Sequence, residues 1–159
     1  MKKITIKKQD LKDIINNSNN TIIRVINEDV VQFGNKFAYS DDNFKWGRFY
    51  EPISEKKVEE IISIFETIEI KEYSINEIEN KKGYKTNSCF HSNGETIDFF
   101  VRIDNVIYMV SYSTGWGGGY SICTAYNIKT NEFEIAENGD AIVSDEADLF
   151  IEKNIKTLI

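Results

Sequence analysis

The first residues that could do chemistry are a thiol and an imidazole two positions apart, in the segment Cys89-Phe90-His91. In a β-strand, residues two positions apart point to the same face, so both side chains would lie on one side of a sheet. A cysteine nucleophile also needs a histidine within hydrogen-bond reach and a group that orients it, for which Asp98 is the candidate. The alternative is a half-buried cysteine beside a surface histidine, with no catalytic role.

A metal centre would need about four ligands, and Cys89, His91 and Cys123 supply three only if the fold brings them together. Two cysteines are also too few for a disulfide framework, so we expect free thiols. We therefore expect no metal and no cofactor. A small enzyme or ligand-binding domain that uses the Cys89/His91 sheet face remains the alternative function.

A second unusual stretch runs from Thr114 to Gly119 and holds four glycines around Trp116. It lacks the Gly-Lys-Ser/Thr ending and the following helix of a phosphate-binding loop. Two interpretations stay open. The stretch is a hairpin loop or bulge that needs left-handed backbone conformations, or it presents Trp116, flanked by Tyr112 and Tyr120, as an aromatic anchor for a protein partner.

Acidic residues are concentrated near the C-terminus of the chain. Residues 130–152 contain eight Asp and Glu and no Lys or Arg, whereas residues 1–12 carry five lysines against one aspartate. Each acid taken alone has a local explanation, because acids are common in the first turn of a helix and on a solvated strand face. That explanation does not account for the absence of Lys and Arg from residues 130–152. We therefore predict that a basic protein partner docks there. The residues predicted to contact it are Tyr112, Trp116, Tyr120, Glu132, Glu134, Asp145, Glu146 and Asp148.

Length and composition limit the class of protein. The chain has 159 residues, of which 41% are hydrophobic, so it can bury a core, and we expect a single domain over residues 1–159. The formal net charge of −7 argues against nucleic acid and anionic membrane surfaces as partners. No apolar run approaches the roughly 18 residues of a membrane span. The lysines at the N-terminus precede no apolar stretch, so we expect no signal peptide and a cytoplasmic location.

Hydrophobic periodicity predicts the elements that would position these residues. Helices are expected over residues 10–17 and from Ser144 to the C-terminus. A third helix is expected to begin at Ser54, with an apolar stripe that includes Phe65. A fourth is expected to begin at a capping box, Ser74–Glu77, and to end at Gly83. Strands are expected over the ranges 4–6, 21–26, 30–33, 36–40, 68–73, 84–91, 96–103, 106–113, 120–129 and 132–136. The predicted fold class is α+β, with an antiparallel meander of about 6–8 strands, helices packed on one face, and a C-terminal helix.

The strand expected over 120–129 has a bulky face and a small face. Strict alternation places Ser121, Cys123 and Ala125 together, next to Ser111 and Ser113 of the preceding strand. Either a helix packs closely against this small face, or a partner or ligand lies across it.

The chain resembles, in general character, the bacterial toxin-immunity proteins of polymorphic-toxin and contact-dependent-inhibition systems. The residues that carry the resemblance are the loop Gly115–Gly119 and the acidic run Glu132–Glu152, in a small acidic α+β chain. The resemblance implies a cytoplasmic inhibitor that neutralises a cognate toxin, commonly a nuclease, by binding its basic C-terminal domain. A further alternative is an accessory domain whose partner adds a strand to a sheet edge.

Overall fold

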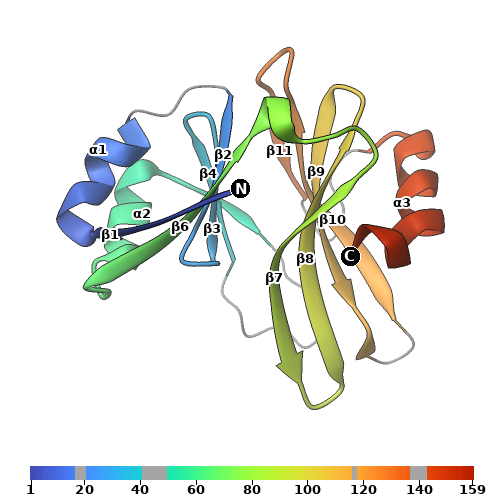
Figure 1. The fold of residues 1–159 in the computed structure, drawn as a ribbon, viewed down its shortest axis with the longest axis horizontal. Helices are drawn as coiled ribbons and strands as arrows, with labels where there is room; N and C mark the ends of the chain where they lie inside the picture. The colour runs from blue at the N-terminus through green and yellow to red at the C-terminus, as the bar shows by residue number, and fades with distance from the viewer. Residues whose placement is uncertain (17–20, 41–49, 116–117, 137–142) are drawn as a thin grey trace. The chain divides into compact units, whose positions relative to one another are not determined.

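The computed structural model describes residues 1–16, 21–40, 50–115, 118–136 and 143–159. Within these residues it contains eleven β-strands, three α-helices and two short 3-10 helices (Figure 1). The strands form two sheets, of six and five strands, and neighbouring strands in both sheets are antiparallel. The α+β class, the antiparallel pairing and the C-terminal helix are confirmed, with the strands divided between two sheets.

The chain forms two compact units. The N-terminal unit covers residues 1–40 and 51–78, and the C-terminal unit runs from Glu79 to Ile159 and includes Tyr50. The single domain over residues 1–159 that the length suggests stays a prediction.

The sheet of the N-terminal unit has the strand order β1-β6-β2-β3-β4-β5. Its strands are β1 (Lys2–Lys7), β2 (Ile22–Ile26), β3 (Val30–Phe33), β4 (Lys36–Tyr39), β5 (Glu51–Ile53) and β6 (Thr67–Ser74). Its helices are η1 (Lys8–Asp10), α1 (Leu11–Asn16), α2 (Glu55–Ile62) and η2 (Ile75–Glu77). Apolar side chains of α1 and α2 pack on one face of this sheet, against residues such as Ile26, Ile68 and Ile70.

Local signals in the N-terminal unit were predicted with mixed success. Ser54 caps α2 as expected, because its Oγ accepts a hydrogen bond of 3.1 Å from the Lys57 N–H. The helix ends at Ile62, however, so Phe65 does not lie on its apolar stripe and is 41% exposed. The capping box is also wrong: Ser74 makes no side-chain cap bond, and only a 3-10 turn follows it. The short strand β5 was not predicted; it contains Pro52 and lies at the edge of the sheet, where a strand tolerates proline.

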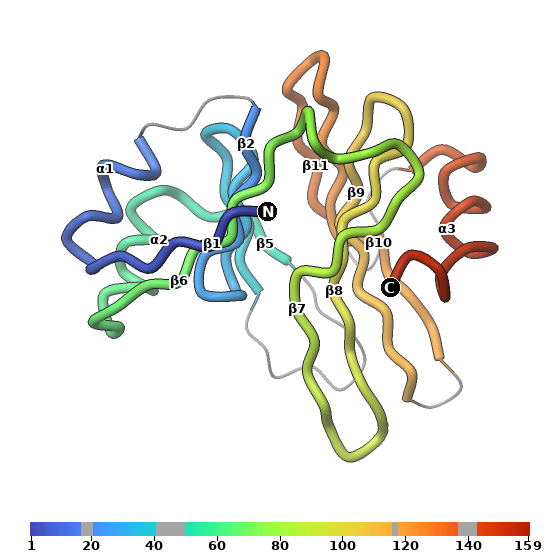
Figure 2. The backbone as a smooth tube through the Cα atoms, viewed as in Figure 1, coloured from blue at the N-terminus to red at the C-terminus, as the bar shows by residue number. Residues whose placement is uncertain are grey.

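The C-terminal unit is a simple meander with the strand order β11-β10-β9-β8-β7. Its strands are β7 (Gly83–His91), β8 (Gly94–Ile103), β9 (Val106–Ser113), β10 (Gly119–Asn127) and β11 (Phe133–Ile135), and its helix is α3 (Asp145–Leu158). Figure 2 shows the chain running back and forth through these strands before it reaches α3. Ser144 caps α3 as predicted, since its Oγ accepts from the Ala147 N–H at 3.2 Å.

The helix α3 packs on one face of this meander. Ala147, Ile151 and Leu158 are buried against Phe99 and Val110 of the sheet, in a common apolar core. Gly83 lies directly against the Leu158 backbone, where a larger residue would collide with the end of the helix. The helix is therefore held to the sheet by its apolar stripe and, at its C-terminal end, by this close contact.

A β-bulge overturns the expected small face of β10. The register shifts between Ile122 and Thr124, so the alternation of side chains is interrupted there. Ser121 pairs with Ser111, but Ala125 lies on the opposite face, in the core that α3 covers. The helix thus packs against the bulky side of the strand, and the small residues do not form one continuous patch.

Candidate functional site

The five acids predicted to bind a partner are all exposed. Glu132 and Glu134 lie just before and within β11, and the other three are in the first turns of α3. None of them forms an ion pair with any residue that the structure describes. We refer to these five residues as the acidic surface; they are Glu132, Glu134, Asp145, Glu146 and Asp148.

The side chain of Tyr108 lies on the same face of the sheet as Glu134. Glu134 is opposite Ala125, which is opposite Tyr108, so these side chains share the face that α3 covers. Burial raises the pKa of Tyr108, hydrogen bonds with Ser144 oppose this shift, and the negative charges of Asp104 and Glu134 add to it. Tyr108 therefore links the sheet to the residue that caps α3.

Tyr120 forms a second link between the sheet and the helix. Its hydroxyl donates a hydrogen bond of 2.8 Å to Asp148 Oδ1 and lies 3.4 Å from the Asp148 backbone oxygen. The rings of Tyr112 and Tyr120 are half-buried and pack at the margin of the core under α3. Tyr120 thus holds the first turns of α3 on the sheet. Their role as partner anchors stays a prediction, and Trp116 lies outside the described residues.

The glycine-rich loop has structural reasons for two of its glycines. A Cβ at Gly115 would lie 2.7 Å from the Asn93 carbonyl oxygen, and Gly118 has a φ of +78°. The loop is also tied to the neighbouring hairpin, because Thr114 accepts from the Glu95 N–H at 2.9 Å and donates its own N–H to the Glu95 carbonyl. These contacts favour the turn interpretation for the described part of the loop.

The alternative site at Cys89 and His91 lies on β7. When the imidazole of His91 is neutral, its Nδ1 accepts from the Asn93 N–H at 3.3 Å, so Nε2 carries the proton and donates to Thr96 Oγ1 at 3.1 Å. Both ring nitrogens therefore already have partners. The exposed thiol of Cys89 lies 3.7 Å from the Phe90 carbonyl oxygen. Asp98 is buried in β8, opposite Asn87.

Metal binding has no geometric support in the resolved ranges. Cys123 is buried in β10, whereas Cys89 is exposed at the edge of the sheet. Across residues 1–16, 21–40, 50–115, 118–136 and 143–159, no three His, Cys, Asp or Glu side chains are grouped as metal ligands would be.

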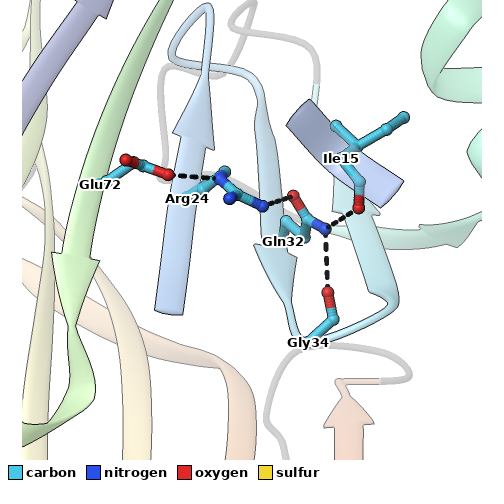
Figure 3. A network of polar contacts seen from close by, with 5 residues as sticks. All are labelled: Ile15, Arg24, Gln32, Gly34 and Glu72. Carbon is cyan, nitrogen blue, oxygen red and sulfur yellow. Dashed lines mark hydrogen bonds and ion pairs between the residues drawn. The ribbon is translucent and has the colours of Figure 1, made fainter. Parts of the chain in front are cut away.

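The N-terminal unit contains a buried ionic network that was not predicted (Figure 3). Arg24 donates from Nε to Glu72 Oε2 at 2.6 Å and from Nη1 to Gln32 Oε1 at 3.2 Å. Gln32 in turn donates to the carbonyl oxygens of Ile15 and Gly34. The only sequence signal was a single arginine in the apolar strand β2. Because the network joins three strands to the end of α1 and finishes on backbone carbonyls, its role is structural.

Comparison with protein-family models, with curated proteins and with solved structures gave no match for this chain. Of the helices in the described residues, none combines the length and the apolar character that crossing a membrane requires.

Proposed function

We propose that this protein is an inhibitor of a basic protein toxin, of the toxin-immunity kind, and that it binds the toxin through its acidic surface. The observation that carries the proposal is that the C-terminal unit has five exposed acids, on or beside β11 and in the first turns of α3, with no cation paired to them among the described residues. Acids that stabilise their own fold are commonly paired with Lys or Arg. Acids left unpaired on one surface are available to a basic partner.

The physical mechanism is electrostatic competition for the catalytic surface of the toxin. A nuclease must attract phosphate, so the entrance to its active site is positively charged, and an acidic protein surface can occupy the same field. Complementary charge mainly raises the association rate and the specificity of such a complex. As an inhibitor of this kind the protein acts in the cytoplasm, with neither nucleic acid nor membrane as its own partner.

The rigidity of the acidic surface supports this mechanism. Ser144 caps α3, Tyr120 holds Asp148, and the apolar stripe of the helix is buried in the core. The carboxylates of α3 therefore start from a defined backbone, and little conformational entropy is lost when a partner binds.

A co-expression experiment tests the function itself. The C-terminal domain encoded by the reading frame next to that of this chain is expressed in a bacterial host, alone and together with this protein. We expect that domain to arrest growth alone and growth to be restored by co-expression. A neighbouring domain that is harmless, or one whose toxicity this protein does not relieve, contradicts the proposal.

A matched pair of charge variants connects the function to the surface. The triple variant Glu134→Lys, Asp145→Lys, Glu146→Lys should lose protection against the toxin. The control variant Asp13→Lys, Glu60→Lys, Glu66→Lys alters exposed acids of the N-terminal unit, changes the net charge equally and should still protect. Equal protection by both variants would show that the acidic surface is not where the toxin binds.

A further inference from the structure

The two sheets present four edges within the described residues, and three of these edges carry features that prevent pairing with another chain. The edge strand β1 has three lysines, β5 has Pro52, and β11 has Glu134 at its centre. Charges and proline on edge strands are common defences against unwanted strand addition. The remaining edge is β7 of the C-terminal unit.

The second half of β7 carries none of these defences. A bulge between Lys85 and Asn87 separates it from the first half of the strand, and from Asn87 to His91 there is no Asp, Glu, Lys, Arg or Pro. Lys85 lies 3.9 Å from Glu95 of the same hairpin, so the hairpin balances its own charges. The side chain of Phe90 is 79% exposed at this edge.

The backbone of this segment is oriented to accept another strand. Glu95 directs its N–H and its carbonyl oxygen to Thr114, away from β7. Phe90 pairs with Glu95, and in an antiparallel ladder both members of such a pair point their backbone groups away from each other. The N–H and carbonyl groups of Phe90, and by the same alternation those of Ser88, therefore point outward from the sheet.

We propose that a second copy of this chain pairs with β7, antiparallel and about a two-fold axis that passes beside Cys89. In this register Ser88 of each copy is opposite Phe90 of the other, and each pair exchanges two backbone hydrogen bonds. Cys89 is opposite Cys89 of the second copy at a non-hydrogen-bonded position. The two Phe90 rings are diagonal neighbours on one face, within reach of each other.

The absence of charge on this edge argues for a second copy, rather than a basic or an acidic strand, as the occupant. A basic or an acidic strand would gain no Coulomb attraction from the uncharged segment Asn87–His91, and would find opposite charges at β11 or β1 instead. Two copies of an uncharged segment, by contrast, meet without like-charge repulsion although the whole chain has a net charge of −7. The proposed pairing uses no residue of the acidic surface, so it is independent of the proposed function.

Sedimentation equilibrium over a concentration series tests the pairing. We expect the full chain to show a reversible monomer–dimer equilibrium. Phe90→Lys places two like charges together at the interface and Ser88→Pro removes an outward N–H, so each should weaken dimerisation by about tenfold or more. The matched control is Ile64→Lys, which adds the same charge at a side chain that is 80% exposed in the N-terminal unit, and which should still dimerise.

A thiol crosslink tests the register. A short bis-maleimide reagent should join two copies through Cys89, and Cys89→Ser should abolish the crosslinked product because the other thiol, Cys123, is buried. A monomeric mass at every concentration overturns the proposal. It is also overturned if Phe90→Lys and Ser88→Pro, with native circular dichroism, dimerise as the unaltered chain does, or if the dimer gives no Cys89 crosslink.

Discussion

The buried ion pair of the N-terminal unit and the acidic surface of the C-terminal unit place acidic residues in opposite circumstances. In the N-terminal unit Glu72 is bound to the buried Arg24, Glu69 to Lys3 and Glu60 to Lys57. In the C-terminal unit the five acids of the acidic surface are exposed and have no ion pair among the described residues. The difference indicates that Glu72 supports the fold, whereas the acids of the acidic surface are available for binding.

The buried and the exposed acids should contribute differently to the free energy of unfolding. A buried charge that loses its partner is left without solvation, which is costly, whereas an isolated exposed charge contributes little to stability. Substitutions at Glu72 or Arg24 should therefore change folding. Substitutions on the acidic surface should change mainly binding, and those in the first turn of α3 should cost about 0.3–1 kcal/mol of folding free energy each through the helix dipole.

The largest expected effect comes from breaking the buried ion pair. Arg24→Ala leaves Glu72 partly buried without its cation, so we expect the free energy of unfolding to fall by about 3–5 kcal/mol. Lys3→Ala, which removes the cation of the exposed pair with Glu69, should cost at most about 1 kcal/mol. Urea denaturation measures both. Equal losses of folding free energy in the two variants would contradict the claim that the buried ion pair stabilises the fold more than the exposed one.

The next largest effect concerns the contact between the C-terminal end of α3 and the sheet. Gly83→Ala places a methyl group against the Leu158 backbone and should destabilise the protein by about 1–3 kcal/mol through overpacking. Gly119→Ala is the control, because nothing lies within 4 Å of a Cβ at that position. Thermal unfolding compares them. If Gly83→Ala were as stable as Gly119→Ala, the close contact that holds the end of α3 would not exist in solution.

The helix caps of the two units should be equivalent. Ser144→Ala and Ser54→Ala each remove one hydrogen bond to a backbone N–H of the first turn, and each should cost about 1 kcal/mol. Urea midpoints of the two variants measure the costs. A loss at Ser54 without one at Ser144 would mean that α3 does not depend on its cap, and that its carboxylates start from a less defined backbone.

The smallest expected effect is the dependence of stability on alkaline pH, which reports on the buried phenol of Tyr108. Burial raises the pKa of Tyr108 above its ordinary value of 10.0, so the folded chain holds this proton more tightly than the unfolded chain does. The stabilisation is complete below pH 10 and is lost as the pH rises through the folded-state pKa. Tyr108→Phe should therefore reduce the slope of stability against pH in this range. An unchanged slope would contradict the buried environment of this phenol.

Local chemistry was readable from the sequence, but long-range pairing was not. The caps Ser54 and Ser144 and the strands β3 and β9 follow from neighbouring residues, because turn chemistry and side-chain alternation act over a few positions. The division into two sheets depends on β6 pairing with both β1 and β2, which lie far from it in the sequence. The bulge in β10 changed which residues share a face, and the residue types in this strand do not predict where a bulge occurs.

The candidate site was predictable to a similar extent. The acids of α3 and β11 could be named because a run without cations is visible in the sequence. The contact of Tyr120 with Asp148 joins residues 28 positions apart and required the fold. The network of Arg24, Gln32 and Glu72 likewise needed the register of β2 with its two neighbours, since an arginine in an apolar strand does not identify its partner.

The central claim is that the acidic surface of the C-terminal unit binds a basic partner and contributes little to folding. The most direct test measures the association rate with the toxin domain encoded by the neighbouring reading frame, at several salt concentrations, for the two triple charge variants. The account predicts that Glu134→Lys, Asp145→Lys, Glu146→Lys slows association about tenfold or more and flattens its salt dependence. The control Asp13→Lys, Glu60→Lys, Glu66→Lys should associate much faster than that variant. Equal rates and equal salt dependence for the two variants would contradict the claim.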